Sequence, residues 1–132
     1  MVSDNSIYYN DEHILLRKTV REFAQNELAP LAIDIDTKGI FPSESIKKLS
    51  ELGLMGIPWD PKYGGGGMDM LSLVITIEEL AKVCVSTAAT LMAHTSLGTG
   101  PFSYFGTDEQ KNKYLTKLST GQMIGSFGLT EP

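Results

Sequence analysis

Apolar residues recur along most of the chain three or four positions apart, which is the spacing of one face of an α-helix. The first such stripe follows Asn10, a residue type suited to capping a helix N-terminus. It consists of Leu16, Val20, Phe23, Ala24 and Leu28. Pro30 lacks an N–H and its ring clashes with the preceding turn. The helix should therefore end or kink there, with a short helical extension over residues 31–35.

Three more helices are predicted between residues 42 and 97. The second begins at Pro42 and ends at Gly53, which can take the left-handed conformation that terminates helices. The third follows Asp69 as its N-cap and carries apolar residues around most of its circumference, which indicates a central, buried helix. The fourth, residues 87–97 after Ser86 as its N-cap, is rich in alanine, so a neighbour or a ligand can approach it closely.

A capping box predicts the fifth helix, residues 108–118. In the run Thr-Asp-Glu-Gln at 107–110, the hydroxyl of Thr107 can accept a hydrogen bond from the N–H of Gln110. The side chain of Gln110 can in turn accept one from the N–H of Thr107. This reciprocal pairing fixes the start of the helix.

The periodicity changes near the C-terminus. Residues 123–130 alternate small and large side chains and end in a β-branched threonine, which predicts a strand. A lone strand has no partners for its N–H and C=O groups. We therefore interpret residues 1–121 as a helical domain and residues 122–132 as the first strand of a second domain, in a chain that looks truncated. The predicted fold class is all-α, a helical bundle with the start of a β-strand at its C-terminus.

Composition and charge exclude several classes of function. Eleven basic residues against sixteen acidic ones give a net charge of −5, which argues against nucleic-acid binding. No apolar run approaches the roughly 20 residues that span a bilayer, and the N-terminus lacks the pattern of a signal peptide. We expect no membrane span and a cytoplasmic location. The single cysteine, Cys84, lies between two valines, which favours a buried thiol over a nucleophile.

Two local patterns suggest chemistry, and neither is complete. Four glycines at 64–67 could present N–H groups to a phosphate, but no Gly-Lys-Ser/Thr ending or preceding strand accompanies them, so an irregular turn is expected. Glu78 and Glu79 could bridge two metal ions, but neither His13 nor His94 stands three residues after a glutamate. No metal site is predicted. His94 is expected to be a hydrogen-bonded helix residue that lines an interface.

The order of short motifs is more specific. The chain reads VREF at 20–23, FP at 41–42, LGLMGIP at 52–58, YGG at 63–65, EELA at 78–81, HTSL at 94–97, FGTDEQK at 105–111, YL at 114–115 and GLTEP at 128–132. Over residues 7–132 this series resembles the amino-terminal domain of acyl-CoA dehydrogenases. It is most similar to the short-chain, butyryl-CoA type.

The resemblance implies a fold and an activity. Members of this family have a helical amino-terminal domain, a middle β-domain and a carboxy-terminal helical bundle, and they bind FAD between the last two. They dehydrogenate acyl-CoA between its α and β carbons and pass the electrons through FAD to an electron-transfer flavoprotein. By position, the residues against the flavin would be Phe127, Leu129 and Thr130. Those along the acyl chain would be Ala89, Thr90 and Ala93.

The resemblance also implies that essential groups are missing. The glutamate that removes the α-proton belongs to the carboxy-terminal domain, so we assign no catalytic residue to this chain and expect it to be inactive and free of FAD on its own. Two alternatives remain: a helical interaction module, or part of an acyl-CoA oxidase. Without the other domains, an apolar face of the third and fourth helices should be partly bare and favour a homo-oligomer. Its candidate residues are Ile77, Leu80, Leu91 and Met92.

Overall fold

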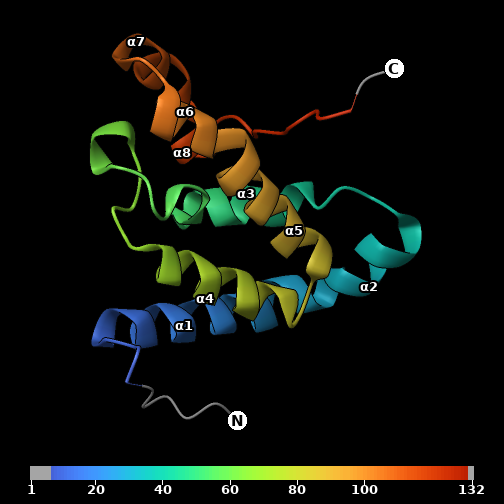
Figure 1. Cartoon of the computed structure of the whole chain (residues 1–132). Helices are drawn as coiled ribbons and strands as arrows, with labels where there is room; N and C mark the ends of the chain where they lie inside the picture. Colours follow the sequence, from blue (N-terminus) through green and yellow to red (C-terminus); the bar gives the residue numbers. More distant parts are fainter. Residues whose placement is uncertain (1–6, 131–132) are drawn as a thin grey trace.

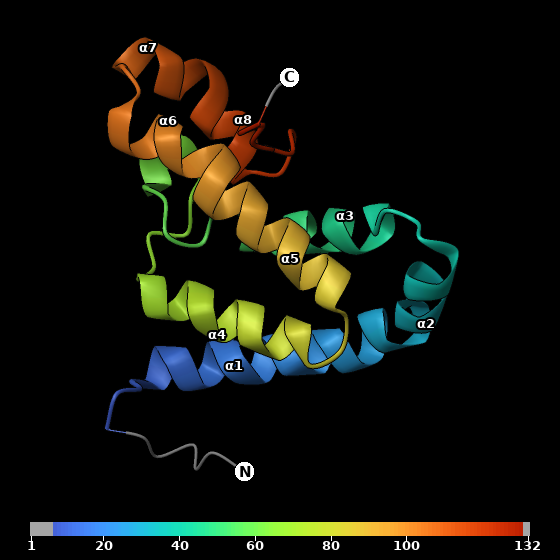
Figure 2. The ribbon, with the colours of Figure 1, turned by 45° about the vertical axis from the view of Figure 1, so that its right-hand side comes forward.

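The computed structural model describes residues 7–130, and helices account for most of them (Figures 1 and 2). The α-helices are α1 (Asp11–Phe23), α2 (Ala29–Lys38), α3 (Ser43–Glu51), α4 (Met70–Ala81), α5 (Val85–Ala93), α6 (Gly100–Phe105), α7 (Asp108–Gln110) and α8 (Thr116–Ser119). Three π-helical turns join some of them: η1 (Ala24–Leu28), η4 (His94–Thr99) and η5 (Lys111–Leu115). Two 3-10 turns, η2 (Leu54–Gly56) and η3 (Pro61–Tyr63), lie in the connection between α3 and α4.

The first helix begins where the sequence predicts. Asn10 caps α1 and forms a capping box with His13, whose N–H donates to the Asn10 side chain over 2.9 Å. At the predicted break, Pro30 occupies the first turn of α2, where its missing N–H costs little. The π-helical turn η1 precedes it, so the chain passes from α1 to α2 without a loop. Pro30 therefore divides the helix, and the predicted extension is α2.

The core forms where α1, α4, α5 and the α3–η2 region meet. Figures 1 and 2 show α4 lying along α1, with α5 crossing between them and α3. The buried residues of this cluster are Val20, Ala24, Leu28, Ile35, Ile46, Leu49, Leu54, Met55, Ile57, Leu73, Leu80, Cys84, Ala88 and Leu91. Burial of Cys84 confirms the plain buried thiol.

The start of the fourth helix differs from the prediction. Cys84 has the extended backbone of an N-cap, and α5 begins at Val85, so Ser86 lies inside the first turn. The Cys84 thiol accepts a hydrogen bond from the Thr87 hydroxyl over 3.2 Å. The sequence reading selected Ser86 because serine is the better capping residue. Here the backbone is fixed by burial of Cys84 in the core.

Beyond α5 the helical path continues through η4 into α6, and the predicted capping box at Thr107 and Gln110 then starts α7. With η5 and α8, this segment reproduces the predicted fifth helix. Among residues 7–130 there is no strand, and residues 124–130 form neither helix nor strand. Residues 131 and 132, the end of the Thr-Glu-Pro motif, lie outside the described residues. The boundary near residue 121 stays a prediction.

Most of the residues expected to form a bare apolar face on the third and fourth helices do not lie at the surface. Leu80 and Leu91 are completely buried in the core, and Ile77 packs against it, so these three residues cannot offer a free surface. Of the four candidates only Met92 is exposed. The broad apolar character of α4 and α5 comes from their contacts with each other and with α1. Oligomerisation stays a prediction.

Candidate functional site

The residues expected along an acyl chain lie on one helix. On α5, Ala89 is exposed, while Thr90 and Ala93 are half-buried. The Thr90 hydroxyl donates to the carbonyl of Ser86 over 2.8 Å, so its hydrogen is used within the helix. What these three side chains offer a ligand is therefore mainly their methyl groups.

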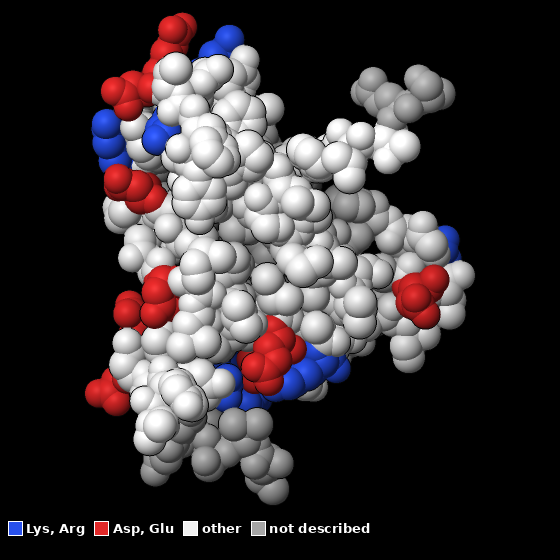
Figure 3. Space-filling model, in the orientation of Figure 1, with Lys and Arg blue, Asp and Glu red and all other residues white. Residues whose placement is uncertain are grey.

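The face around α5 and α6 is almost free of charge. Residues 83–107 contain no Asp, Glu, Lys or Arg, and Figure 3 shows a broad white area across the middle of this view, with charged side chains along its left side, at its right and in a cluster below the centre. The large apolar side chains exposed along this stretch are Val85, Met92, Leu97, Tyr104 and Phe105. An exposed apolar surface of this kind is typical of a binding or domain interface.

The residues expected against a flavin lie on the C-terminal segment. Phe127 is 54% exposed, Leu129 is 82% exposed, and Thr130 is also exposed. Within the described part of the chain, the backbone of residues 126–130 makes no hydrogen bond to another segment. Their N–H and C=O groups and the Thr130 hydroxyl are therefore available to a ligand or to a neighbouring strand.

One contact joins the C-terminal segment to the end of α5. The N–H of Gly125 donates to Nδ1 of His94 over 2.9 Å. His94 is the first residue of the π-helical turn η4 and is fully buried. The segment that carries Phe127, Leu129 and Thr130 therefore starts beside the helix that carries Ala89, Thr90 and Ala93. The two segments meet, whereas the six side chains themselves are not gathered into one pocket.

Two glycines make this contact possible. A Cβ on Gly98 would lie 2.6 Å from the carbonyl carbon of Gly125, and a Cβ on Gly125 would lie 2.9 Å from Cα of Gly98. Real side chains do not tolerate such distances to a backbone, so only glycine fits at either position. The sequence analysis did not pair these two glycines, because they lie far apart along the chain.

Burial determines the charge of the His94 ring. Removal from water lowers its pKa, while backbone groups of Leu118 and Met55 that hydrogen-bond the ring act in the opposite direction without cancelling the effect. The ring is therefore neutral near pH 7. Because Nδ1 accepts from Gly125, the single ring proton belongs on Nε2.

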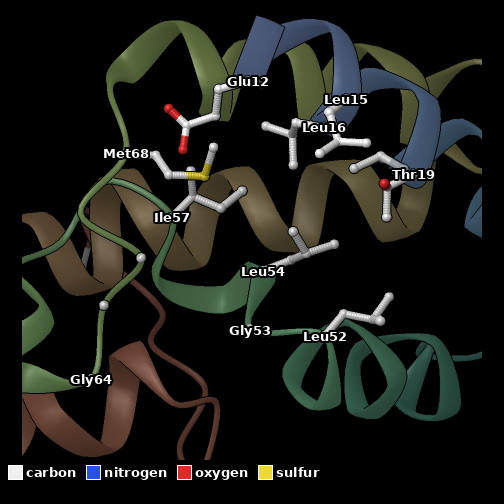
Figure 4. A pocket seen from close by; sticks show the side chains of 13 residues that line it. Glu12, Leu15, Leu16, Thr19, Leu52, Gly53, Leu54, Ile57, Gly64 and Met68 are labelled. Carbon is white, nitrogen blue, oxygen red and sulfur yellow. The ribbon is translucent and has the colours of Figure 1, made fainter.

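A separate pocket lies between α1, η2 and the glycine-rich turn, with a volume of about 490 Å³. Figure 4 shows its aliphatic lining, with the carboxylate of Glu12 at one end beside Met68. Its other lining residues are Leu15, Leu16, Thr19, Val20, Leu52, Gly53, Leu54, Ile57, Gly64, Gly65 and Gly66. The sequence analysis did not find it, because its walls come from segments that are distant along the chain.

The glycine-rich turn is not a phosphate site. The four N–H groups of Gly64, Gly65, Gly66 and Gly67 donate to the carbonyls of Pro61, Asp60, Gly56 and Trp59, respectively. All four N–H groups are therefore hydrogen-bonded to nearby carbonyls, and none remains for an anion. The expected irregular turn is confirmed.

The paired glutamates stabilise the bundle. Glu79 is buried and accepts hydrogen bonds from Arg21, over 3.0 and 3.2 Å, and from Lys82, over 2.8 Å. Burial alone would raise its pKa, but these cations outweigh burial and hold the pKa below its ordinary value. Within residues 7–130 no three His, Cys, Asp or Glu side chains gather in a way that could hold a metal ion, and no helix is long and apolar enough to cross a membrane.

Comparison with known proteins identifies the domain. The acyl-CoA dehydrogenase short-chain specific protein of Clostridium acetobutylicum is 51% identical over 92% of this chain, which covers 32% of that protein. The solved structure of butyryl-CoA dehydrogenase from Megasphaera elsdenii has a TM-score of 0.89 and 40% identity, with 96% of this chain and 34% of that chain covered. A structure described as electron transferring flavoprotein of Acidaminococcus fermentans has a TM-score of 0.91 and 39% identity, covering 96% and 33%.

These comparisons define both the family and its extent here. The chain spans about a third of the length of the relatives it matches. Family members carry FAD, as in a solved acyl-CoA dehydrogenase from Bacillus anthracis that is complexed with it. Residues 10–122 match the family described as acyl-CoA dehydrogenase, N-terminal domain, and the chain belongs to that family.

Proposed function

We propose that this chain is the helical amino-terminal domain of an FAD-dependent short-chain acyl-CoA dehydrogenase. The reaction removes hydrogen from the α and β carbons of a short acyl-CoA and passes two electrons to FAD and then to an electron-transfer flavoprotein. The observation that best supports this function is the contact of Gly125 with His94 and Gly98, because it joins the segment expected beside the flavin to the helix expected beside the acyl chain.

In this proposal the domain helps to bind FAD and the acyl-CoA substrate and to orient them for the reaction. FAD, when bound, supplies the electron-accepting ring. The uncommitted N–H groups of residues 126–130 and the Thr130 hydroxyl would donate to that ring's polar edge and stabilise negative charge that develops there. The uncharged α5 surface would exclude water from the acyl chain. Substrate contacts are assigned to Ala89, Thr90 and Ala93.

No catalytic base is assigned to this chain. Glu79 is buried among cations, and Glu78 pairs with Lys82 over 2.8 Å, on the side of α4 that faces α1. Neither carboxylate is free to abstract a proton from a substrate on α5. We therefore assign neither glutamate as the catalytic base.

The pocket of Figure 4 supports a docking role for the electron acceptor. It is preformed and aliphatic, and the amides of its glycine wall are internally satisfied, so an apolar side chain fits it better than a polar ligand. Interfaces gain most of their affinity from such anchors in pockets. Glu12 at the rim can pair with a basic residue. We assign this pocket to an apolar anchor of the electron-transfer flavoprotein.

A chimera tests the proposed function. Residues 1–130 of this chain replace the matching third of the Clostridium acetobutylicum short-chain enzyme, and bound flavin and butyryl-CoA-dependent dye reduction are measured. We expect about one FAD per subunit and turnover within tenfold of the parent enzyme. Thr130→Val should lower turnover, whereas Thr130→Ser, which keeps the hydroxyl, should preserve it. A folded chimera that binds no flavin would contradict the proposal.

A second assay isolates the docking pocket. Leu15 lines its entrance and is well exposed, so Leu15→Glu changes the pocket with little cost to folding. We expect kcat/KM for the electron-transfer flavoprotein to fall at least tenfold while dye reduction is unchanged. Ile33→Glu, at a residue on α2 that is also well exposed and lies outside this pocket, is the matched control. Equal loss in both variants would refute the assignment.

A further inference from the structure

We infer that His94 is a positioning residue, which holds the backbone of Gly125 through ring Nδ1 and thereby fixes the path of the segment that carries Phe127, Leu129 and Thr130. The inference deepens the proposed function and relies on it for the link to FAD. The anchoring itself is a property of this chain and can be tested without any cofactor.

His94 is the last point at which the helical domain holds the segment. Before it, the N–H of Met123 donates to the carbonyl of Lys117 over 3.1 Å, and the segment then reaches Gly125. Beyond Gly125, the described residues make no further backbone hydrogen bond to the bundle. Loss of the His94 contact would therefore release the chain between Met123 and the residues expected beside the flavin.

The surroundings of His94 keep its Nδ1 available as an acceptor. The hydroxyl of Thr99 donates to the carbonyl of His94 over 2.7 Å and lies 3.5 Å from Nε2. The carbonyl of His94 is therefore satisfied by a side chain of η4 itself. Backbone groups of Leu118 and Met55 contact the same ring. With its ring held from α8 and η2, His94 cannot turn Nδ1 away from Gly125 without breaking other bonds.

Protonation of His94 should break the anchor. A proton on Nδ1 would face the N–H of Gly125, and two donors repel each other. The elements that pack against η4 are α5, α6 and η2, and the ring also meets α8 and residues 121–130. The only Asp, Glu, Lys or Arg on these elements is Lys117, which is exposed. No carboxylate on these elements stabilises the imidazolium, so the anchored form is the neutral one.

Two substitutions separate the hydrogen bond from the volume of the ring. His94→Asn keeps an acceptor near the place of Nδ1, whereas His94→Leu fills similar space without one. In isotope-labelled chain, we expect amide exchange of Gly125 to be at least tenfold faster in the Leu variant and within about threefold of wild type in the Asn variant. Amides of α1 and α4 serve as the control for folding.

The wild-type ring gives a readout that does not depend on any variant folding. Its ¹⁵N shifts should show a proton on Nε2 and none on Nδ1 at pH 7, and acid titration should shift the Gly125 amide together with the ring. A proton on Nδ1, or a Gly125 amide equally protected in the Leu variant, would overturn the inference.

The chimera distinguishes failure of the inference from failure of the proposed function. In the chimera, we expect His94→Leu to lower kcat for butyryl-CoA at least tenfold with little change in KM. We expect His94→Asn to keep kcat near that of the unsubstituted chimera. Faster Gly125 exchange without any change in flavin absorbance or kcat would leave the anchor established and refute the flavin role of residues 127–130. Unchanged exchange would refute the anchor itself.

Discussion

Glu79→Gln should destabilise the bundle by about 1–3 kcal/mol, the range for losing hydrogen bonds between a buried carboxylate and charged groups. Glu79 is 2% exposed and lies against Arg21, Lys82 and Arg17. Arg21 and Lys82 are half-exposed and can return to water. Arg17 cannot, because it is buried, but it keeps Glu78 at 3.5 Å as a partner. The cost therefore comes mainly from the hydrogen bonds that Glu79 accepts from Arg21 and Lys82.

Urea unfolding monitored by circular dichroism measures this cost, and Glu78→Gln is the matched control. Glu78 is the next residue on α4, pairs with Lys82 and Arg17 over 2.8 and 3.5 Å, but is itself 41% exposed at its side chain. Exposed pairs contribute about 0–1 kcal/mol, so this variant should lose no more than that. If both variants lose the same stability, burial of the charge is not what makes Glu79 costly to replace.

Other predictions concern the C-terminal segment and the isolated chain. Gly98→Ala should displace residues 123–130 and raise Gly125 amide exchange at least tenfold, while Gly128→Ala, where a Cβ meets no neighbour, should not. Because the pKa of His94 is lowered from 6.5, the unfolded chain binds the proton more readily, so stability to urea should fall as the pH drops below about 6.5, and His94→Asn should flatten that dependence. The purified chain should contain no stoichiometric FAD and reduce no dye with butyryl-CoA, and a flavin band near one equivalent would contradict this. Light scattering should find a homo-oligomer, and a strict monomer at high concentration would refute that expectation.

Local signals predicted the parts of the fold that depend on neighbours in sequence. The N-cap at Asn10, the capping box at Thr107, the break at Pro30 and the left-handed Gly53 all act within a few residues, and all of them are confirmed. The error at Ser86 has a tertiary cause, because burial of Cys84 sets the helix start two residues earlier. Leu80 and Leu91 were misjudged for the same kind of reason, since periodicity shows that a face is apolar but not which neighbour covers it.

The contacts that build the candidate site are of longer range. The N–H of Gly125 donates to a residue thirty-one positions earlier, and no pattern in the sequence predicts that contact. The sequence did predict His94 as a hydrogen-bonded residue, which the structure confirms, but it could not identify Gly125 as the partner. The assignments of Phe127, Leu129 and Thr130 came from resemblance alone and stay predictions.

The motifs that carried the resemblance also have a physical explanation. In LGLMGIP at 52–58, a Cβ on Gly56 would lie 2.6 Å from the carbonyl oxygen of Ser119, so this glycine lets η2 cross the backbone of α8. In HTSL at 94–97, His94 binds Gly125, and the adjacent Gly98 touches the same residue. Both motifs thus lie where segments distant in sequence meet backbone to backbone. Through these contacts, both motifs hold the C-terminal part of the chain against the bundle.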